Sequence, residues 1–180
     1  MDFLQNFRQK LFESSLDKKL NNLSIDKQSI NFEASKKIGI LFDVTNPVDE
    51  KCIWDYAEKL KHQGKDVDLL AYVNDNIRHN NYAFRHFNKK DLNWIYQPKI
   101  QMVEAFMEKK FDILFCFYVN ILPPLEYVAG LSKAHMRVGS YQEDKIHCLD
   151  LMVDTGKTTD MATKINLIDQ FVRLVNRTIS

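Results

Sequence analysis

Short apolar runs alternate with stretches of helical periodicity along most of this chain. The clearest runs are Lys37 to Phe42, Val67 to Val73, Ile113 to Tyr118 and Leu149 to Val153. Each has the length of a strand and is rich in β-branched or aromatic residues, as are strands buried on both faces of a parallel sheet. A shorter strand is expected at 136–139. The pattern predicts an α/β fold: three layers around a Rossmann-like, mostly parallel sheet of about five strands.

Helices are expected between these strands. The predicted helices are 48–63, closed by Gly64; 99–110; a helix opened by Pro123-Pro124 and running to Lys133; and a last helix capped by Thr159 or Asp160. The stretch from Asp75 to Pro98 mixes turn-forming and aromatic residues and is long for a plain connection. We expect it to hold either short helices or a functional loop.

An amphipathic helix is predicted ahead of the first strand. Its apolar positions recur at steps of three and four residues: Phe3, Leu4, Phe7, Leu11, Leu20 and Leu23. We therefore divide the chain into an N-terminal helix with a linker, 1–35, and a Rossmann-like domain, 36–180. The helix is expected to pack on the sheet or on another subunit; the alternative is attachment to a membrane surface or to another protein.

Composition narrows the classes of function. The 180 residues favour one domain, and the formal net charge of +1 gives no overall attraction to nucleic acid. Three cysteines without a CxxC pair are typical of reduced core thiols, and we expect a cytoplasmic location. No apolar run reaches the roughly 20 residues of a membrane span, and the N-terminus lacks a signal peptide's apolar stretch. The five histidines show no metal-ligand spacing, so neither a metal site nor a cofactor is predicted.

Basic and aromatic residues interleave between Ile77 and Lys90. They are Arg78, Arg85, Lys89 and Lys90 with Tyr82, Phe84 and Phe87. Such a mixture can bind single-stranded RNA by stacking and charge neutralisation. We favour the alternative, a half-buried helix whose aromatic side chains join the core.

Candidate ligand-binding residues follow the predicted strands, because ligands of doubly wound sheets bind outside the carboxyl ends of the strands. Asp43 is the catalytic candidate, and the ligand-binding candidates are Thr45, Asn46, Asn120, Ser140, Tyr141, Asp154, Thr155 and Lys157. The helix starts at Val48, Pro124 and Asp160 would aim amide donors at the same edge, which suits an anion. The same residue types also cap turns and helices, so a purely structural role stays open.

Two resemblances add to this interpretation. The segments KIGILFD, FDILFCFYVN, PPLEYVAGLSKAHMRVGSY and LDLMVD, with FNKKDLNW, resemble a small uncharacterised α/β family of Bacteroidota, which implies a fold without an activity. The passage FDILFCFYVNILPPLEYVAGLSKAHMRVG is similar to the acceptor domain of heptosyltransferase-like glycosyltransferases. Those enzymes have a Gly-Asp in the first loop and a second, sugar-nucleotide domain. Here no Gly precedes Asp43 and no second domain is predicted, so glycosyl transfer by this chain alone is not expected.

Two classes of function follow. The first is a non-catalytic interaction or ligand-sensing module, whose N-terminal helix contacts a protein partner or a second copy. The second is an enzyme acting on a small anionic or nucleotide-linked substrate, with Asp43 as base or nucleophile and Thr155 or Lys157 contacting the anion.

Overall fold

The computed structural model describes residues 3–24, 31–44, 47–78, 82–118, 121–143, 147–158 and 160–175. The helices are α1 (Phe3–Asn21), α2 (Pro47–His62), the 3-10 turn η1 (Lys89–Asp91), α3 (Gln101–Glu108), α4 (Pro123–Leu131) and α5 (Met161–Val175). The strands are β1 (Lys37–Asp43), β2 (Asp66–Val73), β3 (Arg85–Asn88), β4 (Ile113–Phe117), β5 (Met136–Ser140) and β6 (Leu151–Val153).

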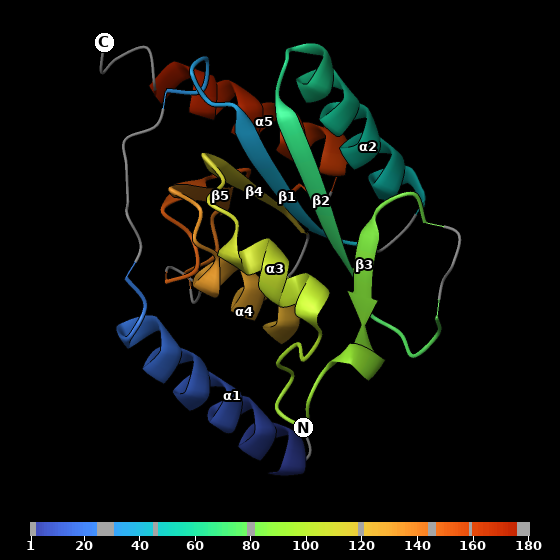
Figure 1. The fold of residues 1–180 in the computed structure, drawn as a ribbon, viewed down its shortest axis with the longest axis vertical. Coiled ribbons are helices and arrows are strands. Elements are labelled where there is room, and N and C mark those ends of the chain that lie inside the picture. Colours follow the sequence, from blue (N-terminus) through green and yellow to red (C-terminus); the bar gives the residue numbers. More distant parts are fainter. Residues whose placement is uncertain are drawn as a thin grey trace.

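The six strands form one parallel sheet in the order β3-β2-β1-β4-β5-β6 (Figure 1). This is the strand order of the doubly wound dinucleotide-binding folds, and the order reverses between β1 and β4. The predicted α/β class with a parallel Rossmann-like sheet is thus confirmed, but the expected number of about five strands is wrong. The strand that the prediction lacked is β3, at the edge of the sheet.

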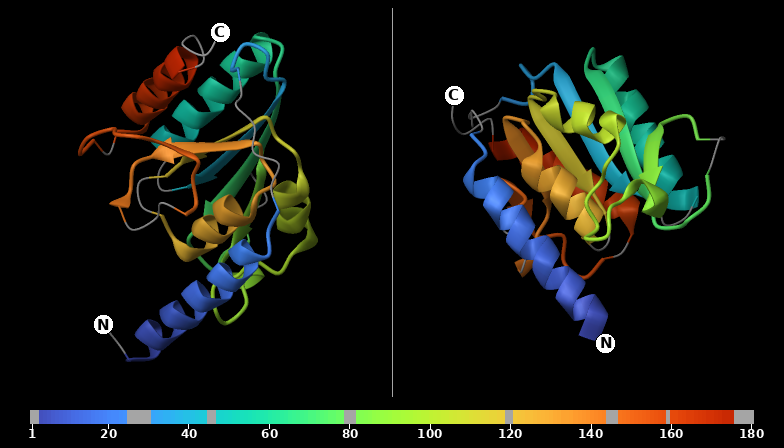
Figure 2. Two further views of the ribbon diagram at one scale, coloured as in Figure 1. Left: turned by 90° about the vertical axis from the view of Figure 1, so that its left-hand side faces the viewer. Right: turned by 60° about the horizontal axis from the view of Figure 1, so that its bottom comes forward.

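Both faces of the sheet are covered, which explains why the strands are continuous apolar runs. Helices α2 and α5 lie on one face, and α3 and α4 lie on the other (Figures 1 and 2). Asp169 of α5 connects α5 to α2, because it accepts a hydrogen bond from Tyr56 Oη at 2.9 Å and lies 3.7 Å from Lys59 Nζ. Burial, together with this carboxylate, raises the pKa of Tyr56 well above its usual range.

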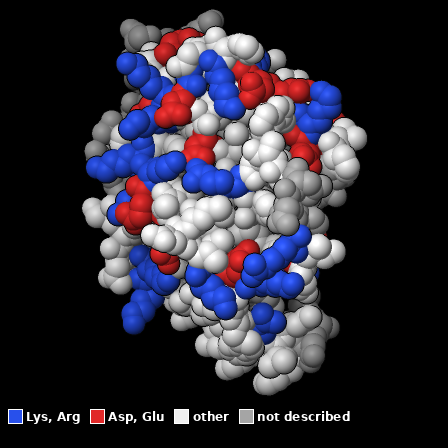
Figure 3. All heavy atoms as spheres, turned by 45° about the vertical axis from the view of Figure 1, so that its right-hand side comes forward, with Lys and Arg blue, Asp and Glu red and all other residues white. Residues whose placement is uncertain are grey.

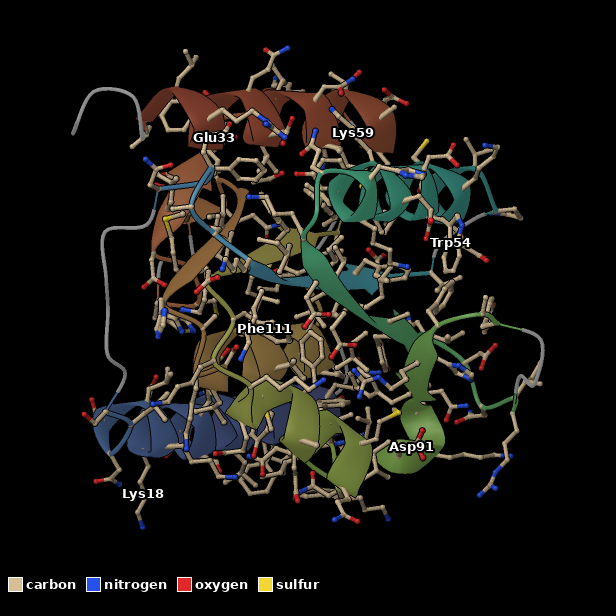
Figure 4. All side chains as sticks on the ribbon, turned by 45° about the horizontal axis from the view of Figure 1, so that its top comes forward. Lys18, Glu33, Trp54, Lys59, Asp91 and Phe111 are labelled. Atoms are coloured by element: carbon tan, nitrogen blue, oxygen red, sulfur yellow. The ribbon has the colours of Figure 1, made fainter. Side chains whose placement is uncertain are left out.

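Helix α1 lies outside α4 and forms an additional layer (Figure 2). It buries Phe12 and Leu16, which are 0% and 1% exposed, against the same apolar cluster as α3 and α4. The predicted apolar stripe is largely wrong, because its first four members are exposed: Phe3, Leu4, Phe7 and Leu11. Lys18 points away from the molecule on the outer side of this helix (Figure 4). Helix α1 therefore has two apolar sides, of which only one is used by the core.

One glycine of β1 is required by close packing. A Cβ at Gly39 would lie 2.9 Å from both the ring of Phe111 and Leu114 Cδ1, closer than such atoms can approach. Phe111 is almost fully buried on the α3 side of the sheet (Figure 4). The absence of a side chain at Gly39 lets this ring fill the space against β1.

The segment between Ile77 and Lys90 differs from its favoured interpretation as a helix. The structure forms β3 there, because Phe87 is completely buried beside Tyr72 of β2, with ring centroids 5.0 Å apart. Phe84 packs on Phe42 at 5.1 Å, so its expected place in the core is confirmed. Arg85 pairs with Asp68. On the face shown in Figure 3, acidic and basic side chains are mixed rather than gathered into a basic patch.

The remaining boundaries agree with prediction to within a few residues. Gly64 ends α2 with a φ of 80°, and its amide donates to the carbonyl of Lys61 at 2.8 Å, as its C-cap role requires. Asp160 caps α5 by accepting from the amide of Thr163 at 2.8 Å; Thr159 lies outside the described residues. Within the described part of the chain, no helix has the length and apolar composition that a membrane span needs.

Candidate functional site

A cavity of about 600 Å³ opens at the carboxyl edge of the sheet, beneath the first half of α1. In Figure 1 this region lies below the sheet, where the start of α1 meets the segment around η1. We call it the α1 cavity. It is lined by Gln5, Asn6, Arg8, Gln9, Tyr72, Asn74, Lys89, Leu92, Asn93, Tyr96, Leu122, Pro123 and Pro124. Its residues come from α1, the end of β2, the stretch after β3 and the start of α4, so the topology places it where a doubly wound sheet binds ligands.

Arg8 supplies the best-defined cation of the α1 cavity. Its guanidinium carbon lies 4.1 Å from the centroid of the Tyr96 ring, and its Nε donates to the carbonyl of Trp94 at 2.8 Å. Stacking on an aromatic face and a hydrogen bond through Nε fix the plane of the guanidinium. Among the described residues, Nε is the only atom of this group that forms a hydrogen bond, so the two terminal nitrogens are available to a ligand.

The loop that carries Tyr96 is held by its own hydrogen bonds. Asn93 Oδ1 accepts from the amides of Ile95 and Gln97, both at 3.0 Å, and the Asn93 amide donates to the Gln97 carbonyl at 2.8 Å. Tyr96 has a φ of 63°, a left-handed conformation that is uncommon for an aromatic residue. The backbone accepts this conformation at the position where the ring supports Arg8. Functional sites are where such backbone conformations cluster.

The opposite wall of the α1 cavity carries neutral donors and a second cation. Burial, and then the carboxylate of Asp75, raise the pKa of Tyr72 to about 12, so this phenol is protonated at neutral pH. Its hydroxyl lies 3.4 Å from Asn74 Oδ1. Lys89, in η1, brings a second positive charge. None of the thirteen described lining residues is acidic, so the cavity favours an anion.

The sequence-predicted site residues that the structure describes lie elsewhere along the same edge, and none of these lines the α1 cavity. Asp43 ends β1 and is 5% exposed. Lys164 of α5 and Asp49 of α2 are also buried, at 5% and 8%. Burial lowers the pKa of Lys164, while the charges of Asp43 and Asp49 oppose that shift. These three groups form a buried charged cluster near the starts of α2 and α5.

The other described candidates form a separate group after β5 and β6. Thr155 Oγ1 donates to Ser140 Oγ at 3.3 Å, and both residues are buried. Asp154 accepts from the amide of Gly156 at 2.8 Å, as in a turn. Tyr141 is 53% exposed and Lys157 is exposed. Thr45, Asn46 and Asn120 lie outside the described residues.

The expected amide donors at the start of α4 are not available. Pro123 and Pro124 have no N–H, and the amides of Leu125 and Glu126 both donate to the carbonyl of Leu122 at 2.9 Å. The prediction of an anion-binding helix start is therefore wrong for α4. Its two prolines instead give the α1 cavity an apolar wall.

Sequence reasoning missed one cluster of polar side chains. His147 Nε2 lies 2.9 Å from Glu126 Oε1, and one ligand atom from each of Glu126, His147 and Cys148 lies within 4.8 Å of the others. The spacing of the histidines in the sequence gives no indication of this contact. His147 and Cys148 are adjacent in the sequence, but the sequence does not show that Glu126 joins them, because α4 and the segment after β5 meet only in the folded chain.

Comparison with known proteins identifies a family but no activity. The model of a family of unknown function, DUF6913, matches residues 8–172. No curated protein and no solved structure shows a significant match. The match extends from the first turns of α1 to the last turns of α5, and thus includes every strand of the sheet. Because the match covers nearly the whole chain, this protein belongs to the DUF6913 family of unknown function.

Proposed function

We propose that this protein is a non-catalytic ligand-sensing module that binds a small anion with a planar or apolar part in the α1 cavity. The observation that carries the proposal is Arg8, which is stacked on Tyr96 in a cavity that contains a second cation and no acidic lining residue. A planar guanidinium with free terminal nitrogens suits bidentate recognition of a carboxylate or phosphate.

The size and lining of the α1 cavity support a small molecule. Its volume of about 600 Å³ falls within the range typical of ligand sites. Leu92, Leu122 and the two prolines form apolar surface, while amide side chains offer neutral hydrogen bonds. This combination suits an aromatic carboxylate, a nucleotide or a comparable anion better than a bare inorganic ion.

Helix α1 connects the cavity to the surface, which supports a sensing role. Its inner side contributes Arg8 to the cavity, and its outer side exposes Phe3, Leu4 and Phe7. Phe7 also contacts the half-exposed ring of Trp94, at 6.3 Å between centroids. A ligand that holds Arg8 would therefore change how firmly the start of α1 is docked, and a protein partner or second copy could bind the exposed apolar side.

The test is thermal unfolding of the full chain against a panel of nucleotides, sugar nucleotides, aromatic carboxylates and inorganic phosphate. A ligand at one hundred times its dissociation constant adds about 2.7 kcal/mol, which corresponds to a rise of roughly 5–10 °C for a chain of this size. We expect one class of anion to produce this shift and Arg8→Ala to remove it. Lys10→Ala is the matched control, because Lys10 lies on the same helix but does not line the cavity. An equal shift in Arg8→Ala would contradict the proposal.

A second candidate is an enzyme acting on a small anionic or nucleotide-linked substrate at the carboxyl ends of the strands. The buried cluster of Asp43, Asp49 and Lys164 favours it, because pKa values shifted by burial and neighbouring charge are frequent at catalytic sites. Asp43 would act as base or nucleophile, with Thr155 or Lys157 contacting the anion. A substrate-dependent activity that survives Asp43→Asn unchanged would rule out this assignment.

The finer sequence predictions stay proposals. The three cysteines are free, which supports a reducing, cytoplasmic location. Origin in Bacteroidota and a distant relation to the acceptor domain of heptosyltransferase-like enzymes rest on the sequence resemblances alone. The division of the chain at residue 35 rests on the predicted helix and linker ahead of the first strand.

A further inference from the structure

We propose that Glu126, His147 and Cys148 form a binding site for a divalent transition-metal ion of the zinc type. This site is independent of the α1 cavity and goes beyond the function proposed above. Each residue offers one ligand atom, and the three atoms lie within 4.8 Å of one another.

The geometry is close to that of a loaded site. Tetrahedral zinc holds oxygen and nitrogen at about 2.0–2.2 Å and sulfur at about 2.3 Å, which places neighbouring ligand atoms about 3.3–3.8 Å apart. Glu126 Oε1 and His147 Nε2 are 2.9 Å apart and need to separate by about 0.5 Å, whereas the distances to the sulfur, at most 4.8 Å, need to close by about 1 Å or less. Rotation of the three side chains is enough for such a change.

The set of ligands selects the type of ion. A thiolate with an imidazole favours zinc and related transition metals, whereas magnesium and calcium prefer oxygen ligands alone. When the ion binds, Cys148 loses its thiol proton to solvent, and the ring nitrogen of His147 that binds the ion carries no proton. One thiolate and one carboxylate then balance the two positive charges, so the loaded site is neutral.

The surroundings of the cluster suit a metal centre. Glu126 is 1% exposed and Cys148 is completely buried, whereas the His147 side chain is 36% exposed. An ion can thus enter from the His147 side, and a water molecule can complete four ligands there. Three protein ligands with one open position is the arrangement of catalytic rather than structural zinc sites.

A further buried polar group, Tyr118, lies in the core cluster that contains Cys148. Tyr118 is 2% exposed, and its hydroxyl has no hydrogen-bond partner of standard geometry among the described residues. Tyr118 belongs to the same buried cluster as Cys116 and Cys148. Buried polar groups without a partner are rare and need an explanation.

The experiment is titration of the purified full chain with Zn²⁺, followed by calorimetry, and with Co²⁺, followed by absorption spectroscopy. We expect one ion per chain and a thiolate-to-cobalt charge-transfer band. His147→Gln and Cys148→Ser should each weaken Zn²⁺ binding by at least about tenfold, and Cys148→Ser should abolish the band. The matched controls His62→Gln and Cys52→Ser replace the same residue types on α2 and should change neither.

The variants also guard against a folding artefact. Cys148 is buried, so its serine variant is compared with the wild type by circular dichroism first. If that variant does not fold, His147→Gln decides the question, because this side chain is partly exposed. Failure of the wild-type chain to bind Zn²⁺ would overturn the proposal, as would binding that is unchanged in His147→Gln. Neither result bears on anion binding, since Arg8 and Tyr96 belong to the α1 cavity.

Discussion

Replacing Phe12 by alanine tests whether α1 is a working part of the core. The Phe12 side chain is 0% exposed and packs in the apolar cluster shared by α1, α3 and α4. Phenylalanine-to-alanine changes in protein cores cost about 3–5 kcal/mol. Because α1 is an outer layer that can shift to fill space, we expect the lower end, about 3 kcal/mol. For a chain of this length that corresponds to a fall in Tm of roughly 6–12 °C.

Phe7→Ala is the matched control for this prediction. It removes the same group from the same helix, but Phe7 is 48% exposed and its aromatic contact is with the half-exposed Trp94. We expect this variant to lose about 1 kcal/mol or less. Urea unfolding, with both variants showing the wild-type slope, gives the two free-energy differences directly. Equal losses in the two variants, or a loss below about 1 kcal/mol for Phe12→Ala, would refute the packing that we assign to α1.

Two further predictions concern buried charge. Arg137 is 5% exposed, and it donates through Nε and Nη2 to the carboxylate of Asp150 at 2.9 and 3.0 Å. Arg137→Met should therefore lower the free energy of unfolding, measured in urea, by about 3 kcal/mol. A decrease of less than about 1 kcal/mol would contradict this prediction. Burial alone would raise the pKa of Asp112, but amide hydrogen bonds from Lys37 and Lys36, at 2.9 and 2.7 Å, lower it below its usual value. Its stabilising contribution should therefore be complete above about pH 4 and lost as the pH falls through the lowered native pKa. The difference in urea midpoint between wild type and Asp112→Asn should shrink in that range, and a difference that is constant down to pH 2 would disprove it.

The strands of the inner sheet could be predicted from sequence because their signal is local. β1, β2 and β4 are buried on both faces, so nearly every residue in them is apolar. β3 escaped prediction because it is a short edge strand in which only part of the sequence faces the core, with Arg85 and His86 beside Phe87. The interleaved basic and aromatic residues of this segment do not show the strict alternation of apolar and polar positions by which a strand is recognised in a sequence.

The site was less predictable because it is assembled from distant segments. The carboxyl edge of the sheet was the expected location, and the α1 cavity does lie there. Its key cation, Arg8, is on a helix whose inner and outer sides were assigned incorrectly from the spacing of apolar residues. The sequence does not show that Arg8 meets Tyr96, because that contact depends on how α1 is placed against a loop 88 residues later. The grouping of Glu126 with His147 depends in the same way on the fold.

The most direct test of anion binding is a fluorescence titration of Trp94 in a Trp54→Phe background, which leaves Trp94 as the only tryptophan. The Trp94 carbonyl accepts the Arg8 hydrogen bond, and its ring lies 5.7 Å from the guanidinium carbon. A ligand that engages Arg8 should therefore change the emission. We predict a saturable change with the anion that raises Tm, and a loss of affinity of at least about tenfold in Arg8→Ala, as expected for a charge-assisted contact. An affinity that is the same with and without Arg8 would contradict the α1 cavity as the binding site.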